Sequence, residues 1–88
     1  MVEPENISNI AKRIIGERLK VSEDQITDDT NIARDLGMDS LGGIEIVMDL
    51  EEALGVEIPD TDAERLITFK QIIHYIQKKL EQEKGKKL

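Results

Sequence analysis

Residues 35–54 read DLGMDSLGGIEIVMDLEEAL, and this stretch decides the expected fold. At Asp39 and Ser40 a polar segment gives way to apolar residues with helical spacing, which predicts a helix over residues 40–54. Asp39 is a suitable N-cap and Gly55 a suitable C-terminal stop for it. The residues expected to form its buried stripe are Leu41, Ile44, Val47, Met48, Leu50 and Leu54, with Ile46 widening the stripe.

The same spacing predicts a helix over residues 4–19 and a last helix that starts after Thr68. A short helix is expected over residues 60–66, after an extended segment that ends at a proline. The polar connection over residues 20–39 is long enough to be functional or to contain a helical turn. Its expected core anchors are Ile26, Ile32 and Leu36. The predicted fold class is all-α, a four-helix bundle with three longer helices, one short third helix and a long first loop.

Composition sets limits on the function. The 88 residues predict one domain over residues 1–82 and a charged, flexible C-terminal tail over residues 83–88. There is no cysteine, so the chain can form neither a disulfide nor a thiolate metal site. No apolar run is long enough to cross a membrane, and the N-terminal residues do not resemble a signal peptide. We therefore expect a monomer that is cytoplasmic or the mature form of an organelle protein.

The net charge of −7 is unevenly distributed. Residues 35–64 contain ten acidic residues and no Lys or Arg, whereas the rest of the chain has nine acidic and twelve basic residues. Such a field repels nucleic acid and attracts basic protein surfaces. The alternative interpretation is a solvated acidic face that only aids solubility.

Ser40 is the candidate site for chemistry. The common role of an Asp-Ser pair before an apolar pattern is helix capping. However, a phosphate on the Ser40 hydroxyl would also lie near free backbone N–H groups and the positive end of the helix dipole. The position therefore suits a phosphodiester.

The runs at residues 35–41, 44–52 and 56–60 (DLGMDSL, IEIVMDLEE and VEIPD) resemble the acyl carrier proteins, and the resemblance covers essentially the whole chain. It implies that Ser40 receives 4′-phosphopantetheine from coenzyme A through a Mg²⁺-dependent phosphopantetheinyl transferase. The thiol of the arm would carry acyl groups as thioesters between enzymes of fatty acid biosynthesis, and the acyl chain would lie between the helices. The protein would then be a cosubstrate of its partner enzymes and not an enzyme itself. A specialised carrier for a polyketide, lipid-modification or other secondary pathway remains an alternative.

The resemblance also implies roles for single residues. Asp39, Ser40 and Leu41 match the attachment motif. The residues that match the face that binds basic patches on partner enzymes are Glu45, Met48, Asp49, Glu51, Glu52, Glu57, Asp60 and Glu64. Gly42 and Gly43 depart from the family pattern, in which bulkier polar residues are more common. The glycine pair could loosen the start of the helix, or it could let the backbone of a partner approach Ser40.

The sequence also has features of three other classes of protein. A hydrolase could use Ser40 with His74, but no nucleophile-elbow pattern surrounds the serine. Calcium binding is suggested by Asp28 and Asp29, but no EF-hand loop can be aligned. An interaction domain that is never modified would share the acidic helix. No metal site, nucleic-acid partner or membrane insertion is expected.

Overall fold

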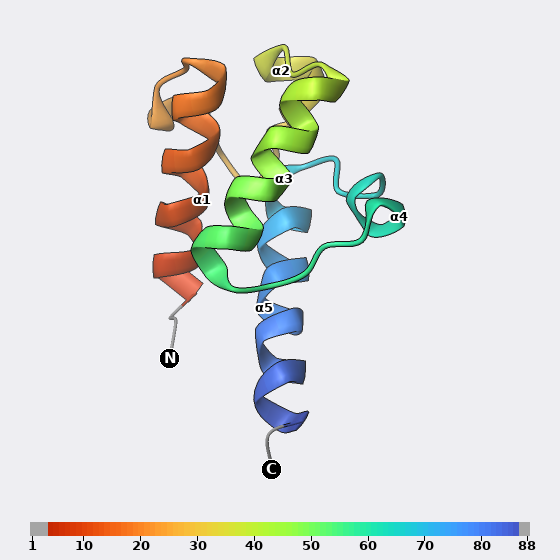
Figure 1. The fold of residues 1–88 in the computed structure, drawn as a ribbon. Helices are drawn as coiled ribbons and strands as arrows, with labels where there is room; N and C mark the ends of the chain where they lie inside the picture. The colour runs from red at the N-terminus through yellow and green to blue at the C-terminus, as the bar shows by residue number, and fades with distance from the viewer. Residues whose placement is uncertain (1–3, 87–88) are drawn as a thin grey trace.

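Three long helices and three short helical segments make up residues 4–86, the part of the chain that the computed structural model describes (Figure 1). In chain order they are α1 (Pro4–Leu19), the 3₁₀ helix η1 (Glu23–Gln25), α2 (Ile32–Leu36), α3 (Ser40–Leu54), α4 (Asp60–Ala63) and α5 (Phe69–Lys86). These residues form no strand, only an isolated bridge between Asn31 and Thr68. Of the helices described, none has both the length and the apolar character needed to cross a membrane. The predicted all-α class is confirmed.

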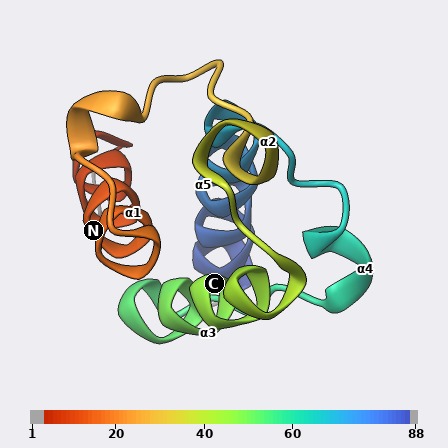
Figure 2. The ribbon, with the colours of Figure 1, turned by 90° about the horizontal axis from the view of Figure 1, so that it is seen from above.

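The three long helices enclose an aliphatic core (Figure 2). Its most deeply buried side chains include Ile7 and Ile15 of α1, Leu50 of α3, and Phe69 and Ile76 of α5. Complete burial of a side chain of this size contributes about 1.5–3 kcal/mol relative to an exposed position. The helical spacing of these residues along the chain is therefore what brings α1, α3 and α5 together.

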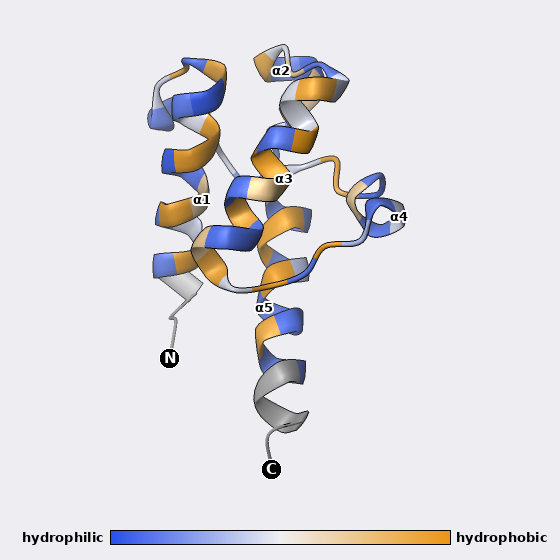
Figure 3. Cartoon of the chain, in the orientation of Figure 1, coloured by the Kyte–Doolittle hydropathy of each residue, from blue (hydrophilic) through white to orange (hydrophobic). Residues whose placement is uncertain are grey.

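The buried face of α3 differs from the prediction. Ile46, Leu50 and Leu54 are buried, whereas Leu41, Ile44 and Met48 are 65%, 57% and 59% exposed. Figure 3 shows apolar residues recurring along α3, so the helix has more than one apolar face. Packing against α1 and α5 selects the face that is buried, and periodicity within α3 alone could not. The expectation that Leu41 starts the core stripe was wrong.

Short helices interrupt the long connection between α1 and α3. Ile26 and Ile32 are buried, as predicted, and Leu36 packs against the core. The backbone of this connection is tied to the start of α5, because the N–H of Ile32 donates to the carbonyl of Ile67 and the N–H of Phe69 donates to that of Thr30. The connection is thereby held in place on its way to the start of α3.

The last two helices have different lengths from those predicted. α4 ends at Ala63, and residues 64–65 form a turn, so the short helix expected over residues 60–66 is shorter. Thr68 caps the next helix as predicted, because its hydroxyl accepts from the N–H of Gln71 at 3.3 Å. α5 continues to Lys86, so residues 83–86 of the predicted tail are helical, and residues 87–88 lie outside the described residues. The predicted flexibility of this tail and the domain boundary at residue 82 stay predictions.

Candidate functional site

Ser40 is the first residue of α3, and its side chain is exposed. The turn before it contains Gly37 with φ 73°, a left-handed conformation that suits glycine. Asp39 caps the helix as predicted, because its Oδ1 accepts from the N–H of Gly42 at 2.7 Å and its carbonyl from the N–H of Gly43 at 2.9 Å. The first two N–H groups of the helix, those of Ser40 and Leu41, precede the first intrahelical bond. These two groups have no partner within the helix and can donate to an anion at its N-terminus.

The electrostatics at this position favour an anion. α3 has 15 residues, and its aligned peptide dipoles place partial positive charge at the end where Ser40 lies. There is no acidic residue in its first turn. A phosphate bonded to the Ser40 hydroxyl would therefore meet N–H donors, with the Asp39 carboxylate already engaged as the cap.

A pocket of about 800 Å³ opens beside Ser40, between α3, α4 and α5. Ser40 and Met38 are among its lining residues, and most of the wall beyond them is aliphatic. The apolar residues of this wall include Ile44, Ile46, Val47 and Leu50 of α3, Ile58, Ala63 and Leu66 on the side of α4, and Ile72 of α5. The arrangement places the Ser40 hydroxyl at a mainly apolar cavity, which also has the acidic residues Glu51, Asp60 and Glu64 in its lining.

Gly42 and Gly43 provide space at the start of α3. A Cβ at position 43 would lie 3.2 Å from Cε of Met38, and one at position 42 would lie 3.1 Å from Oδ1 of Asp39. The glycines therefore accommodate the Met38 side chain and the Asp39 cap. This packing is a physical reason for the pair that the sequence did not reveal.

Some of the predicted partner-binding residues are exposed, and others contact residues of the same chain. Glu52, Glu57, Asp60 and Glu64 are exposed, as is the apolar Met48. Glu51 instead has a structural contact, because its Oε2 accepts from the N–H of Ile58 at 2.8 Å and so holds the chain segment that follows α3. Glu45 and Asp49 bind a cation from within the chain, Arg18 of α1.

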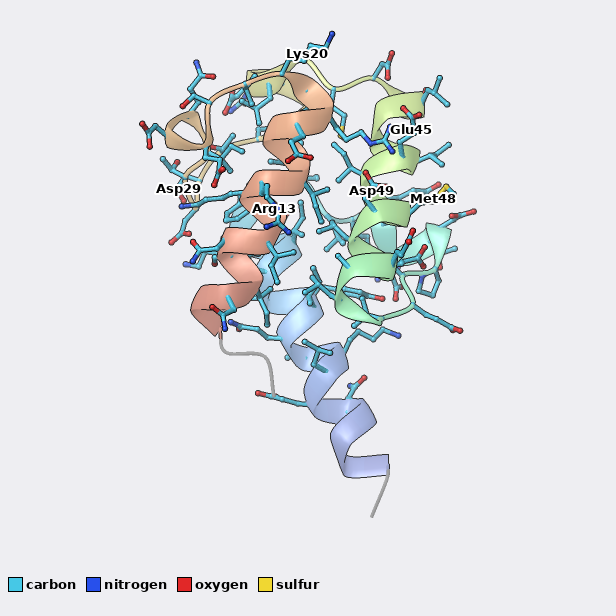
Figure 4. The ribbon with its side chains drawn as sticks, turned by 60° about the vertical axis from the view of Figure 1, so that its left-hand side comes forward. Arg13, Lys20, Asp29, Glu45, Met48 and Asp49 are labelled. Atoms are coloured by element: carbon cyan, nitrogen blue, oxygen red, sulfur yellow. The ribbon has the colours of Figure 1, made fainter. Side chains whose placement is uncertain are left out.

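Arg18 is a residue that sequence reasoning missed, because it lies 31 positions before Asp49 and outside the acidic segment. Its Nε donates to Oδ2 of Asp49 at 2.6 Å and its NH2 to Oδ1 at 3.2 Å, while NH1 lies 3.3 Å from Oε2 of Glu45. The hydrogen bond from Arg18 is the main reason that the pKa of Asp49 is lowered. Figure 4 shows Glu45 and Asp49 along α3, with Met48 pointing away from α1.

A second contact joins α4 to α5. The hydroxyl of Tyr75 donates to Oδ2 of Asp62 at 2.5 Å in a partly buried setting. Burial and this hydrogen bond raise the pKa of Tyr75 to about 12. Because Asp60, Ala63 and Glu64 line the pocket, the contact fixes one of its walls.

The residues of the other hypotheses lie apart from any such arrangement. His74 is exposed on α5, and no hydrogen bond joins it to Ser40. Asp28 and Asp29 are exposed in the first loop. Among the side chains that the structure describes, those of residues 6–82, no three His, Asp or Glu gather in a way that could hold a metal ion.

Comparison with known proteins identifies relatives over most of the chain. Residues 10–76 match the family described as the phosphopantetheine attachment site. The chain is 42% identical over 80 residues to the acyl carrier protein of Thermotoga maritima, covering 91% of this chain and 99% of the relative. It is 46% identical over 76 residues to the acyl carrier protein of Lactobacillus johnsonii, covering 86% and 94%. It is also 46% identical over 66 residues to that of Campylobacter lari, covering 75% and 86%.

Proposed function

The chain belongs to the phosphopantetheine-attachment family, which its acyl carrier relatives represent, and we propose that Ser40 is its attachment residue. The protein then carries acyl groups as thioesters on 4′-phosphopantetheine and shuttles them between enzymes of fatty acid biosynthesis. The observation that carries this proposal is the exposed Ser40 hydroxyl at the N-terminus of α3, beside an apolar pocket.

Ser40 acts as the acceptor in the attachment reaction. Its Oγ forms a phosphodiester with the pantetheine phosphate of coenzyme A, the pyrophosphate bond breaks and 3′,5′-ADP leaves, while the serine proton passes to a base of the transferase. The N–H groups at the start of α3 and the helix dipole support the resulting negative charge. The residues around Ser40 therefore fit the group.

The bound arm supplies a thiol, which a chain without cysteine cannot provide. The protein supplies a pocket in which the acyl chain can bind. An acyl chain in the aliphatic pocket would be removed from water, which is favourable for hydrocarbon. The wall contains no aromatic side chain, so flexible aliphatic groups shape the cavity.

The acidic residues on and after α3 provide the docking face of this proposal. It consists of Glu45, Asp49, Glu52, Glu57, Asp60 and Glu64 with the exposed Met48, and it meets basic patches on the transferase and on fatty acid synthesis enzymes. Glu51 contributes charge but is held by its bond to the Ile58 N–H. Charge pairing of this kind gives faster encounter and correct register more than affinity. The protein is thus a cosubstrate of enzymes, and its cytoplasmic location and monomeric state remain predictions.

The test is modification in vitro. The purified apo protein is incubated with a phosphopantetheinyl transferase, coenzyme A and Mg²⁺, and its intact mass is measured. We expect a gain of one phosphopantetheinyl group, none for Ser40→Ala, and a full gain for Ser22→Ala. Ser22 is a matched control because it is also exposed and its hydroxyl also lies at a helix start, that of η1. A folded protein that stays unmodified, or a Ser40→Ala variant that is still modified, would overturn the proposal.

A further inference from the structure

The guanidinium of Arg18 is paired with two carboxylates of the proposed docking face. Each of its three nitrogens lies within 3.3 Å of a carboxylate oxygen, two of them on Asp49 and one on Glu45. A guanidinium that pairs with both oxygens of one carboxylate forms the stronger, geometrically matched kind of ion pair. Asp49 therefore has a cation already in place that resembles the one a basic partner would offer.

These groups are also accessible from solvent. The side chains of Arg18, Glu45 and Asp49 are 41%, 44% and 33% exposed. A partner can reach them, but its own Arg or Lys would meet carboxylates that are partly neutralised. The other acids of the docking face differ, because Glu52, Glu57, Asp60 and Glu64 form no ion pair with a residue of the described range.

We infer that Arg18 is an internal competitor for the part of the docking face formed by Glu45 and Asp49. A basic partner must displace its guanidinium before it can bind these two carboxylates. The inference rests on the proposed function, because it concerns the same docking face. It adds that the affinity of the face is set partly by a residue of α1, outside the acidic segment.

The competition is readily reversible. Solvent screens an ion pair at this level of exposure, so the pair is weak, and dissolved salt weakens it further. Partners that make contact first through the four acids without a bound cation could then exchange with Arg18. The result is a face that holds partners less tightly than its charge would allow, which suits a carrier that must leave each enzyme quickly.

The test compares two arginines of α1. Arg18→Met removes the guanidinium and keeps an apolar stem, and Arg13→Met makes the same change in net charge at an exposed position that bonds no described acid. The measured quantities are kcat and KM of a phosphopantetheinyl transferase for each purified apo protein at low ionic strength. We expect Arg18→Met to lower KM by about two- to fivefold with kcat unchanged, since exposed pairs have about this strength. Arg13→Met should lower KM clearly less.

Two further measurements separate competition from structural effects. Adding Arg18→Met to a Glu45→Gln, Asp49→Asn background should leave KM unchanged, because no carboxylates remain to be released. If Arg18→Met does not fold by circular dichroism, Arg18→Lys replaces it, since a lysine loses the two-pronged geometry, and its KM should fall in the same direction.

Failure of the proposed function and failure of the inference about Arg18 give different results. An unaltered protein that no transferase modifies would overturn the proposed function. Modification of the unaltered protein with equal or higher KM for the Arg18 variant, or an equal decrease for Arg13→Met, would overturn the role of Arg18 alone.

Discussion

Lys20 adopts a conformation that is unusual for its residue type. It has φ 57° at the end of α1 and is the one non-glycine with positive φ in the described part of the chain. The N–H of Val21 donates to the carbonyl of Gly16 at 3.1 Å, which is the hydrogen bond of a helix end that normally uses glycine at position 20. The helix end is thus made at the expense of backbone strain.

Lys20→Gly should stabilise the protein. The left-handed conformation costs an ordinary residue about 1–2 kcal/mol, and glycine gives back about 0.5–1 kcal/mol through its freer unfolded chain, so we expect a net gain of about 0.5–1 kcal/mol. Lys78→Gly is the control, because Lys78 is exposed within α5, where glycine should cost about 1 kcal/mol. Urea unfolding measures both, and equal destabilisation would contradict the reading of Lys20.

The local structure around Ser40 could be predicted from the sequence, whereas its role as the attachment residue stays a proposal. The cap by Asp39 and the position of Ser40 at the start of a helix depend on neighbouring residues, and both are present in the structure. Arg18 could not be found in this way, because its partners come from a distant helix. Only the packing of α1 against α3 brings its guanidinium to Glu45 and Asp49.

At the scale of elements, α4 is the least self-sufficient helix. It has four residues, and its N-cap, Pro59, makes no side-chain capping bond. Two contacts from other elements hold it and the segment before it, namely Tyr75 to Asp62 and Glu51 to the Ile58 N–H. The pocket wall on this side is therefore supported from outside.

Tyr75→Phe removes the first of these contacts and keeps the ring. We expect a loss of about 1.5–3 kcal/mol, as for a hydrogen bond to a charged acceptor. The sign of the pH dependence follows from the raised pKa of Tyr75, about 12 against 10.0 for a free tyrosine. The stabilisation is complete below pH 10 and is lost as the pH rises from 10 to 12.

Thermal unfolding followed by circular dichroism tests this prediction. The difference in Tm between the unaltered protein and Tyr75→Phe should be constant from pH 6 to pH 9 and should close above pH 10. All groups other than the Tyr75 hydroxyl are the same in both proteins, so the difference in Tm isolates the contribution of this hydroxyl. A difference that persists unchanged above the pKa of Tyr75 would argue against the hydrogen bond as its source.

Helices were predictable in proportion to their length. α1, α3 and α5 each span several turns, so their apolar spacing was visible in the sequence, and their starts agree with the structure. α2 and η1 have five and three residues, too few to show a period, and were not located within the long connection. Their positions depend on tertiary bonds such as that from the Ile32 N–H to the Ile67 carbonyl.

For the whole molecule, the acidic segment is a source of repulsion. Its ten acids extend over α3, α4 and the segments beside them, and among the side chains of residues 6–82 the cations that pair with them are Arg18 and Arg34. Uncompensated like charges destabilise a compact state, and salt screens them. The acidic segment therefore reduces the stability of the fold that contains it.

Added NaCl or Mg²⁺ should raise the Tm at neutral pH. We expect a gain on the order of 1 kcal/mol, which corresponds to about 4–8 °C for a domain of this size. A Glu52→Gln, Glu57→Gln variant should have a higher Tm without added salt, and its Tm should rise less when salt is added. Both side chains are exposed, so the substitutions mainly remove two negative charges. If the Tm of both proteins did not change with salt concentration, repulsion across the acidic segment would be contradicted.

Tyr75 is the sole tyrosine in a chain without tryptophan, and its hydroxyl donates a hydrogen bond to Asp62 of α4. The native ultraviolet fluorescence of the protein therefore originates at one place. A carboxylate that accepts a hydrogen bond from the phenol quenches tyrosine emission. The fluorescence intensity of Tyr75 would therefore increase when α4 moves away from α5. Loading of cargo could be followed in real time, with no dye attached.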